Sequence, residues 1–361
     1  MDKEKYIYNS FSPNYTIYKF VNFLLPVIFI FISLLISKIS ASQDLHYSQY
    51  FNSELNLNPA LTAYTQGKYR FTLNNRNQWA SVTVPYKTLS ASFETKIINF
   101  KRKRTFIGFG VLFNKDEAGD SKYGTTEIGF SLSAVKSLNN KNTNIISLGF
   151  QTAYYQRSID YTQLYFPEQW NGITSTINSG NSENFAVAKF NFFDVSAGIN
   201  WFWAPSSKLK FNSGISSWHL NKPNQSLMND KTTNLNIKYQ AYSNIEIIIN
   251  QSFNILPGIY YAHLWPYQEF ILGSRLYYKI HQNRNQYFAL STGLFFRNKD
   301  ALILYLGMDY KTLKIGATYD INTSSLSVAS NYMGGMEISI KWLIHKGKDI
   351  RKISPTPCPI F

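Results

Sequence analysis

Cysteine is almost absent from this chain of 361 residues, which contains a single one. One cysteine excludes a disulfide framework and any zinc or iron–sulfur site built from cysteines. Charged residues are also scarce, at 16% of the chain, against about 25% in ordinary soluble domains. Long apolar runs are limited to one, near the N-terminus. A membrane protein made of several apolar helices is therefore excluded as well.

Aromatic residues are abundant instead: 27 Phe, 26 Tyr and 7 Trp make up 17% of the chain. Aromatic surface on this scale must be buried in protein or in lipid, which excludes an intrinsically disordered chain. The net charge of +15 at pH 7 indicates anionic partners. The anionic lipids and sugars of a cell envelope fit this charge better than nucleic acid, because the N-terminus predicts export.

The N-terminus has the layout of a secretory signal. Lysines precede an apolar run from Val21 to Ile36, and the run ends in Ser40-Ala41-Ser42. Small residues of this kind are what a signal peptidase requires before its cleavage site. We therefore predict a cleaved signal peptide over 1–42 and a mature chain that starts at Gln43. The alternative is an uncleaved anchor helix, which the interruptions in the apolar run disfavour.

From residue 67 onward, segments of about ten residues alternate between apolar and polar side chains. In 235–249, for example, Ile245 and Ile247 fall on one face of a strand and Glu246 falls on the other. Clusters of Asn, Gly, Asp, Ser and Lys separate the segments, as turns would. We predict fourteen strands, centred near residues 73, 91, 111, 130, 150, 198, 214, 242, 257, 274, 293, 305, 316 and 339. Pro257-Gly258 predicts a bulge within one of them.

This alternation fits both a soluble sandwich and a membrane barrel, which differ in what covers the apolar face. The segments approach the length a tilted strand needs to cross a bilayer, and aromatic residues crowd their ends. Connections also alternate in length, since the longer ones, at 115–123, 160–191, 221–234 and 321–334, are all odd-numbered. We therefore predict an all-β transmembrane antiparallel barrel in the outer membrane, with its long connections outside the cell.

The predicted barrel covers 67–345 and leaves two flanking segments. Residues 43–66 are expected to form a periplasmic N-terminal segment or a plug, and 346–361 a periplasmic C-terminal tail. Three prolines prevent a strand in the tail. The long connection 160–191 is a second candidate for a plug, if it folds into the barrel mouth.

Catalytic motifs are missing from the sequence. The five histidines are dispersed without metal-binding spacing, and neither a G-x-S-x-G elbow nor a phosphate-binding loop is present. We expect no enzyme activity, no cofactor and no metal site. A barrel enzyme acting on lipid remains an alternative, with pairs such as His219 and Asp309 as candidates. A solute channel is the other alternative, because the expected lumen face carries Lys, Arg, Glu and Asn.

Several short blocks occur in a distinctive order, and they are Gln43–Tyr50, Asn56–Leu61, Asn75–Trp79, Gly316–Asn322, Gly334–Ser339 and the closing Cys358–Phe361. This order closely resembles the PorP/SprF family of the type IX secretion system, over essentially the whole mature chain. The resemblance implies an outer-membrane β-barrel that serves protein secretion and gliding motility by anchoring or docking secreted adhesins at the cell surface. The implied partners are an adhesin or other type IX substrate, subunits of the secretion system and outer-membrane lipid.

Two groups of residues are candidates for partner binding. The first comprises aromatic residues of the longest connection, which are costly to expose to water and typical of interface hot spots: Tyr161, Tyr165, Phe166 and Trp170. The second comes from the family blocks: Asn58, Pro59, Arg76 and Trp79. For the second group, structural roles are the alternative: a turn at Asn58-Pro59 and a cation–π pair between Arg76 and Trp79.

Overall fold

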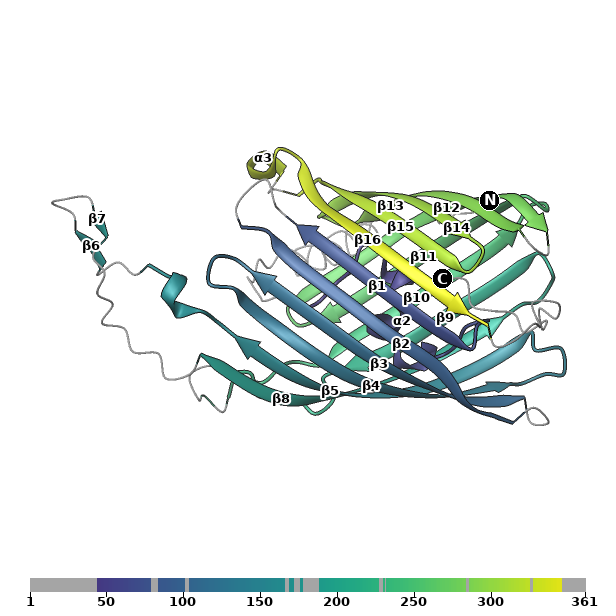
Figure 1. The fold of residues 1–361 in the computed structure, drawn as a ribbon, viewed down its shortest axis with the longest axis horizontal. Coiled ribbons are helices and arrows are strands. Elements are labelled where there is room, and N and C mark those ends of the chain that lie inside the picture. The colour runs from purple at the N-terminus through teal and green to yellow at the C-terminus, as the bar shows by residue number, and fades with distance from the viewer. Residues whose placement is uncertain are drawn as a thin grey trace, which may run out of the picture. The chain divides into compact units, whose positions relative to one another are not determined.

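The polar–apolar alternation of the chain becomes a series of long antiparallel strands in the computed structural model (Figure 1). The structure describes residues 44–78, 84–100, 104–165, 169–171, 176–177, 188–226, 230, 232–283, 286–324 and 327–345. The predicted signal peptide 1–42 and C-terminal tail 346–361 lie outside the described residues. In the described ranges no helix is both long and apolar enough to span a bilayer.

The barrel strands are β1 (Tyr69–Gln78), β2 (Tyr86–Phe100), β3 (Thr105–Ala118), β4 (Tyr123–Ser137), β5 (Asn144–Ser158), β8 (Lys189–Trp203), β9 (Leu209–Trp218), β10 (Lys238–Ile248), β11 (Phe253–Leu264), β12 (Tyr267–Asn283), β13 (Gln286–Arg297), β14 (Ala301–Tyr310), β15 (Leu313–Asn322) and β16 (Met333–Ile344). Two short strands, β6 (Trp170–Asn171) and β7 (Thr176–Ile177), form a separate small sheet. The helical turns are η1 (Tyr50–Asn52), α2 (Glu54–Leu57), η2 (Pro59–Leu61), η4 (Tyr161–Gln163) and α3 (Ser327–Ser330).

The fourteen long strands close into a barrel when β1 pairs with β16. This closing ladder is antiparallel and runs from Tyr69 opposite Ile344 to Gln78 opposite Gly335. Closure gives every barrel strand a neighbour on both sides, which is the condition for a β-sheet to exist in lipid. The predicted fourteen-stranded antiparallel barrel is confirmed, and every predicted strand centre falls within one of these strands.

The two faces of the wall reverse the polarity of a soluble protein. In β4 the outward side chains of Phe130 and Leu132 are 50% and 48% exposed, whereas the inward Ser131 and Glu127 are buried. In β10 the expected alternation is confirmed as well, because Ile247 is exposed and Glu246 is buried in the lumen. An apolar outer face of this extent is costly in water and matches hydrocarbon, so the wall is that of a membrane barrel.

The longest connections all leave the same end of the barrel, here called the long-loop end, at 159–188, 219–237 and 323–332. The opposite end, here called the short-turn end, has connections such as 204–208, 249–252 and 311–312. The prediction of a long connection at 115–123 is wrong. The observed connection covers only 119–122, because β3 and β4 remain paired as far as Ala118 and Tyr123. The polar residues there are accommodated by local pairs, such as Thr88 with Asp116 at 2.5 Å.

The predicted bulge at Pro257-Gly258 is also wrong. The register of β11 against β12 is unbroken where Pro257 lies opposite Ser274. Proline lacks an N–H group, yet the ladder to β10 resumes on both sides without a shift. Register shifts occur elsewhere, in β2 between Lys96 and Ile98 and in β12 between Lys279 and His281.

Candidate functional site: the plugged lumen

Residues Asp44–Thr65, here called the plug, run through the inside of the barrel. The plug is a chain of short turns, η1, α2 and η2, and nearly all of its residues from Tyr47 onward are buried. Asn58 accepts a hydrogen bond from Ala60 N at 2.8 Å and so caps η2, and Pro59 takes the first position of that turn. Residues 44–65 therefore lie inside the barrel in this structure, and the assignment of 43–66 as a periplasmic segment or a plug stays a prediction.

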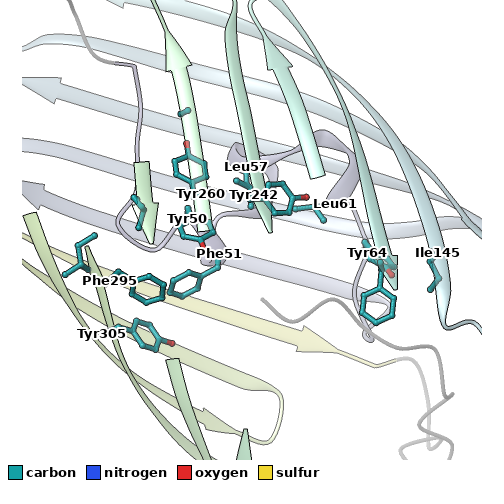
Figure 2. Packing of buried hydrophobic residues seen from close by; sticks show 14 of the residues in the cluster. Tyr50, Phe51, Leu57, Leu61, Tyr64, Ile145, Tyr242, Tyr260, Phe295 and Tyr305 are labelled. Atoms are coloured by element: carbon teal, nitrogen blue, oxygen red, sulfur yellow. The ribbon is translucent and has the colours of Figure 1, made fainter. Parts of the chain in front are cut away.

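An aromatic pair fixes the middle of the plug to the barrel wall (Figure 2). The ring of Tyr50 stacks on Tyr260 of β11, with ring centroids 4.9 Å apart. The ring of Phe51 stacks on Phe295 of β13 at 5.4 Å. The guanidinium of Arg275 lies 3.8 Å from the centroid of Phe51, a cation–π contact inside the lumen. These side chains form the centre of the buried apolar cluster.

Two strand glycines, on β5 and β8, make room for the plug. A Cβ atom on Gly149 of β5 would collide with the backbone of Pro59 and Ala60. A Cβ atom on Gly198 of β8 would collide with the side chain of Asn58. Glycine is therefore required at both positions for the plug to approach the wall this closely.

The side chain of Asn58 also bonds to the wall. Its Nδ2 donates to the backbone oxygens of Ile199 at 3.0 Å and Ile215 at 3.1 Å. Because β8 and β9 are paired neighbours, one amide joins the plug to two adjacent strands. Asn58 is fully buried, and Pro59 beside it is buried too. Their assignment as partner-binding residues stays a prediction, but in this structure their contacts are within the chain.

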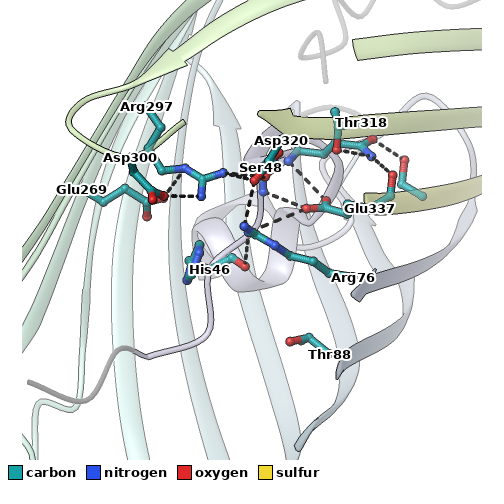
Figure 3. Close-up of polar contacts among 12 residues, drawn as sticks. His46, Ser48, Arg76, Thr88, Glu269, Arg297, Asp300, Thr318, Asp320 and Glu337 are labelled. Carbon is teal, nitrogen blue, oxygen red and sulfur yellow. Dashed lines mark hydrogen bonds and ion pairs between the residues drawn. The ribbon is translucent and has the colours of Figure 1, made fainter. Parts of the chain in front are cut away.

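A buried ionic network holds the plug at the long-loop end (Figure 3). Arg76 of β1 lies 3.0 Å from the carboxylate of Asp320 and donates to the backbone oxygen of His46 at 2.9 Å. Arg297 of β13 shares the same Asp320 oxygen at 2.6 Å. Glu337 of β16 accepts from the backbone N–H of Ser48 at 2.7 Å. The structure therefore places Arg76, another predicted partner residue, in contact with the plug and buries it.

A second ionic network holds the plug toward the short-turn end. Glu54 of the plug lies 3.2 Å from Arg70 and 2.6 Å from Lys341. These two cations compensate the buried negative charge of Glu54. Arg70 also pairs with Glu94 at 2.5 Å, and Glu94 accepts from the backbone N–H of Ala63 at 2.7 Å. Each charged group of this second network therefore has a partner of opposite sign.

The first described residue of the plug, Asp44, contacts both ends of the connection between β9 and β10. Its carboxylate lies 2.8 Å from Lys238, where β10 begins, and 3.6 Å from His219, where β9 has just ended. The other nitrogen of His219 lies 3.1 Å from Asp194 of β8. Burial lowers the pKa of His219, but the carboxylates of Asp194 and Asp44 outweigh burial and raise this pKa to about 9. A charged imidazolium therefore links plug and wall at neutral pH.

These contacts give the plug a direction. Asp44 meets residues at the long-loop end, and Thr65 leads into β1, which starts at the short-turn end. Hydrogen bonds and ion pairs join the plug to β1–β4, β8–β10, β13, β15 and β16, and ring contacts add β11, β12 and β14. The plug thus crosses the lumen from one end to the other and contacts the wall on every side.

The predicted enzyme pair of His219 and Asp309 is not formed. His219 faces Asp194 and Asp44, whereas Asp309 accepts a short hydrogen bond from Tyr277 and lies 3.6 Å from Lys314. The two groups lie on different parts of the wall because β9 and β14 are not neighbours in the sheet.

The aromatic candidates of the longest connection are described only in part. Tyr161 begins the turn η4, and Tyr165 just after it is 74% exposed. The backbone of Trp170 belongs to β6, while its side chain lies outside the described part of the structure. Phe166 and Trp79 fall outside the described residues altogether, so the proposed pair of Arg76 with Trp79 stays a prediction.

A closed barrel with an apolar outer wall, a charged lumen and a plug made from its own N-terminal segment defines a plugged membrane β-barrel. Residues 39–342 match the family described as type IX secretion system membrane protein PorP/SprF. The chain therefore belongs to the PorP/SprF family, as the sequence blocks predicted. No curated protein matches the chain.

Several solved structures are similar to this chain at low sequence identity. The toluene transporter TbuX of Ralstonia pickettii is 9% identical, with a TM-score of 0.48 over 81% of this chain and 94% of TbuX. The P. putida toluene transporter TodX is also 9% identical, with a TM-score of 0.47 over 82% of this chain and 95% of TodX. A Pseudomonas aeruginosa FadL homologue is 9% identical, with a TM-score of 0.45 over 80% of this chain and 93% of the homologue.

Proposed function

We propose that this protein is an outer-membrane anchor of the type IX secretion system, which docks a secreted adhesin at the cell surface. Family membership supports a role in this secretion system. The observation that carries the anchoring role is the plug, because it crosses the lumen and is bonded to the wall by buried ionic networks at both ends. A solute channel needs an open lumen, so this arrangement favours an anchor over a channel.

The proposed orientation places the long-loop end outside the cell and the short-turn end in the periplasm, as in other outer-membrane barrels. Cleavage of the signal peptide fits the path of the plug. Asp44 is held inside the lumen near the long-loop end, so the segment before it would have to be threaded through the barrel if it were retained. We expect a mature chain that starts at Gln43, which N-terminal sequencing of the protein extracted from outer membranes will check. Retention of 1–42 would contradict this.

The docking surface is proposed to be the long connection that carries the exposed Tyr165. Deletion of 171–184 should leave a folded, heat-modifiable barrel and reduce the surface display of the adhesin, measured by antibody labelling of intact cells. The single substitution Tyr165→Ala should also reduce surface display of the adhesin. The matched control is Tyr278→Ala, which removes a half-exposed tyrosine from the barrel wall. Display at the wild-type level in the deletion variant would exclude this connection as the docking site.

A non-catalytic role is part of the proposal. The contacts of His219 in the described part of the chain are with two carboxylates, an arrangement that supports a structural ion pair rather than activation of a nucleophile. Purified protein should therefore release no fatty acid from phospholipid vesicles, and steady hydrolysis lost in His219→Gln would contradict the proposal.

A further inference from the structure

The outer wall of the barrel is not uniformly filled, because a groove of about 480 Å³ lies across the seam where the sheet closes. It spans β1, β2, β3, β15 and β16, all of which are labelled in Figure 1. The outward side chains that line it are all apolar, and those that shape it are Leu73, Ala91 and Phe113 in one row and Phe71, Phe93 and Trp342 in the next.

The groove follows from the register of the strands. In one row across the wall, Ala91 lies between Phe113 on β3 and Leu73 on β1. In the next row, Phe93 and Phe71 lie side by side with ring centroids 4.7 Å apart, and Trp342 follows at 6.2 Å from Phe71. A methyl group among these large side chains leaves a depression, with aromatic rings along one side. Such a depression in a lipid-facing wall is covered by hydrocarbon chains.

A cation marks one border of the groove at the short-turn end. Lys68, just before β1, holds its ammonium 4.7 Å from the ring centroid of Tyr69. The ring of Tyr69 in turn stacks on Phe93, which lines the groove, at 6.0 Å. This series of contacts runs without a gap from a positive charge at the membrane edge to the apolar groove.

A second cation lies on the other side of the seam. Lys311, in the turn between β14 and β15, holds its ammonium 5.2 Å from the ring centroid of Tyr310. Tyr310 pairs with Leu313, which lines the groove beside Trp342. Two lysine–tyrosine pairs therefore flank the same end of one apolar groove, which is the pattern expected for an acidic headgroup above an acyl chain.

We propose that this groove is a binding site for an anionic phospholipid of the periplasmic leaflet. One acyl chain lies against Ala91 and the aromatic row, and the phosphate lies near Lys68 and Lys311. The choice of leaflet rests on the orientation given with the proposed function, whereas the site itself rests on the groove and its lysines. Lipid is favoured over a second copy of the chain because the groove lies among other lipid-facing side chains and is bordered by positive charge. A second copy would place like charges together there.

The test measures lipid retained by the purified full-length protein, using native mass spectrometry after exposure to an equimolar mixture of phosphatidylglycerol and phosphatidylethanolamine. The wild-type protein should retain one molecule of phosphatidylglycerol in preference to phosphatidylethanolamine. Ala91→Trp, which fills the depression, should lose that lipid. The combined variant Lys68→Gln, Lys311→Gln should keep a bound lipid but lower the preference for phosphatidylglycerol about tenfold.

The matched control is Ala241→Trp, which makes the same change on the outer face of β10, away from the groove. It should retain lipid like the wild type, and heat modifiability shows that each variant forms a barrel. Equal lipid retention in Ala91→Trp and the wild type, or the same headgroup preference in the double-lysine variant, would overturn the site. A dimer lost in Ala91→Trp would assign the groove to a second copy instead. Adhesin display is a separate readout, so this site and the anchoring role can fail independently.

Discussion

At the residue scale, paired charges inside the lumen decide how firmly the plug is held. Arg76 is 1% exposed and its partner Asp320 is buried. Loss of one partner from a buried ion pair leaves an uncompensated charge, so we expect Arg76→Met to cost about 3–5 kcal/mol in the free energy of unfolding. Reversible unfolding in lipid vesicles checks this value.

The control for this prediction is an exposed pair of the same kind. Lys115 lies 2.6 Å from Glu117, and both side chains are at least 40% exposed. Lys115→Met should therefore cost at most about 1 kcal/mol. Equal losses in the two variants would show that the lumen network does not hold the plug.

His219 should make stability depend on pH. The pKa of His219 is about 9 in the folded protein and about 6.5 in the unfolded chain. Because the folded pKa is the higher one, the stabilisation is fully present below pH 6.5 and disappears as the pH rises to 9. Its size is about 3 kcal/mol. Asp194, Asp44 and the nearby Lys238 set the local charge.

The measurement is the free energy of unfolding of the wild type and His219→Gln at pH 6 and above pH 9. The two proteins should differ clearly at the lower pH and converge at the higher one. His281→Gln, which changes an exposed histidine, should keep the wild-type pH dependence. A constant difference between wild type and His219→Gln at both pH values would show that the imidazolium is not what links plug and wall.

At the element scale, the fit of the plug depends on small residues in the wall. Gly149→Ala puts a methyl group against the backbone of Pro59 and Ala60, and overpacking of this kind costs about 1–3 kcal/mol. Gly129→Ala is the matched control, because the nearest atom to its new methyl group is Nε2 of Gln151 at 3.3 Å. Unfolding of both variants in vesicles should show a loss for Gly149→Ala and little change for Gly129→Ala.

Depth in the membrane should decide the cost of a charge on the outer face. Leu306 is 66% exposed and lies near the middle of β14, so Leu306→Arg should cost about 2–4 kcal/mol. Ile247 is the penultimate residue of β10 and lies near the membrane edge, so Ile247→Arg should cost at most about 1 kcal/mol. Equal costs in a vesicle unfolding assay would contradict the assigned lipid-facing band.

The strands were predictable from the sequence because every barrel strand obeys one local rule, the alternation of lipid-facing and lumen-facing side chains. Ile245, Glu246 and Ile247 already define both faces of β10. The site was less predictable, since its partners are distant in the chain. The distance from Ser48 to Glu337 along the sequence is 289 residues, and no local pattern joins them. Sequence blocks pointed to Asn58 and Arg76 as important, but their role in holding the plug emerges from burial and geometry.

At the scale of the whole molecule, the proposal gives the plug and the long connections different roles. The plug closes the lumen, and the longest connection docks the adhesin. The plug lies in the lumen of the closed barrel, and its first described residue, Asp44, contacts the base of the connection after β9 through His219. The proposed anchoring role needs no open lumen. For a channel of the same fold to conduct, the plug would have to move out of the lumen.

The most direct test of this anchoring role is the electrical conductance of the purified mature protein in a planar lipid bilayer. We expect no conductance steps from the wild type or from the deletion of 171–184, which leaves the plug in place. Deletion of 44–65 should open the lumen and produce stable steps, provided heat modifiability confirms a folded barrel. Stable steps from the wild-type protein would contradict a plugged anchor and would assign the barrel to solute passage instead.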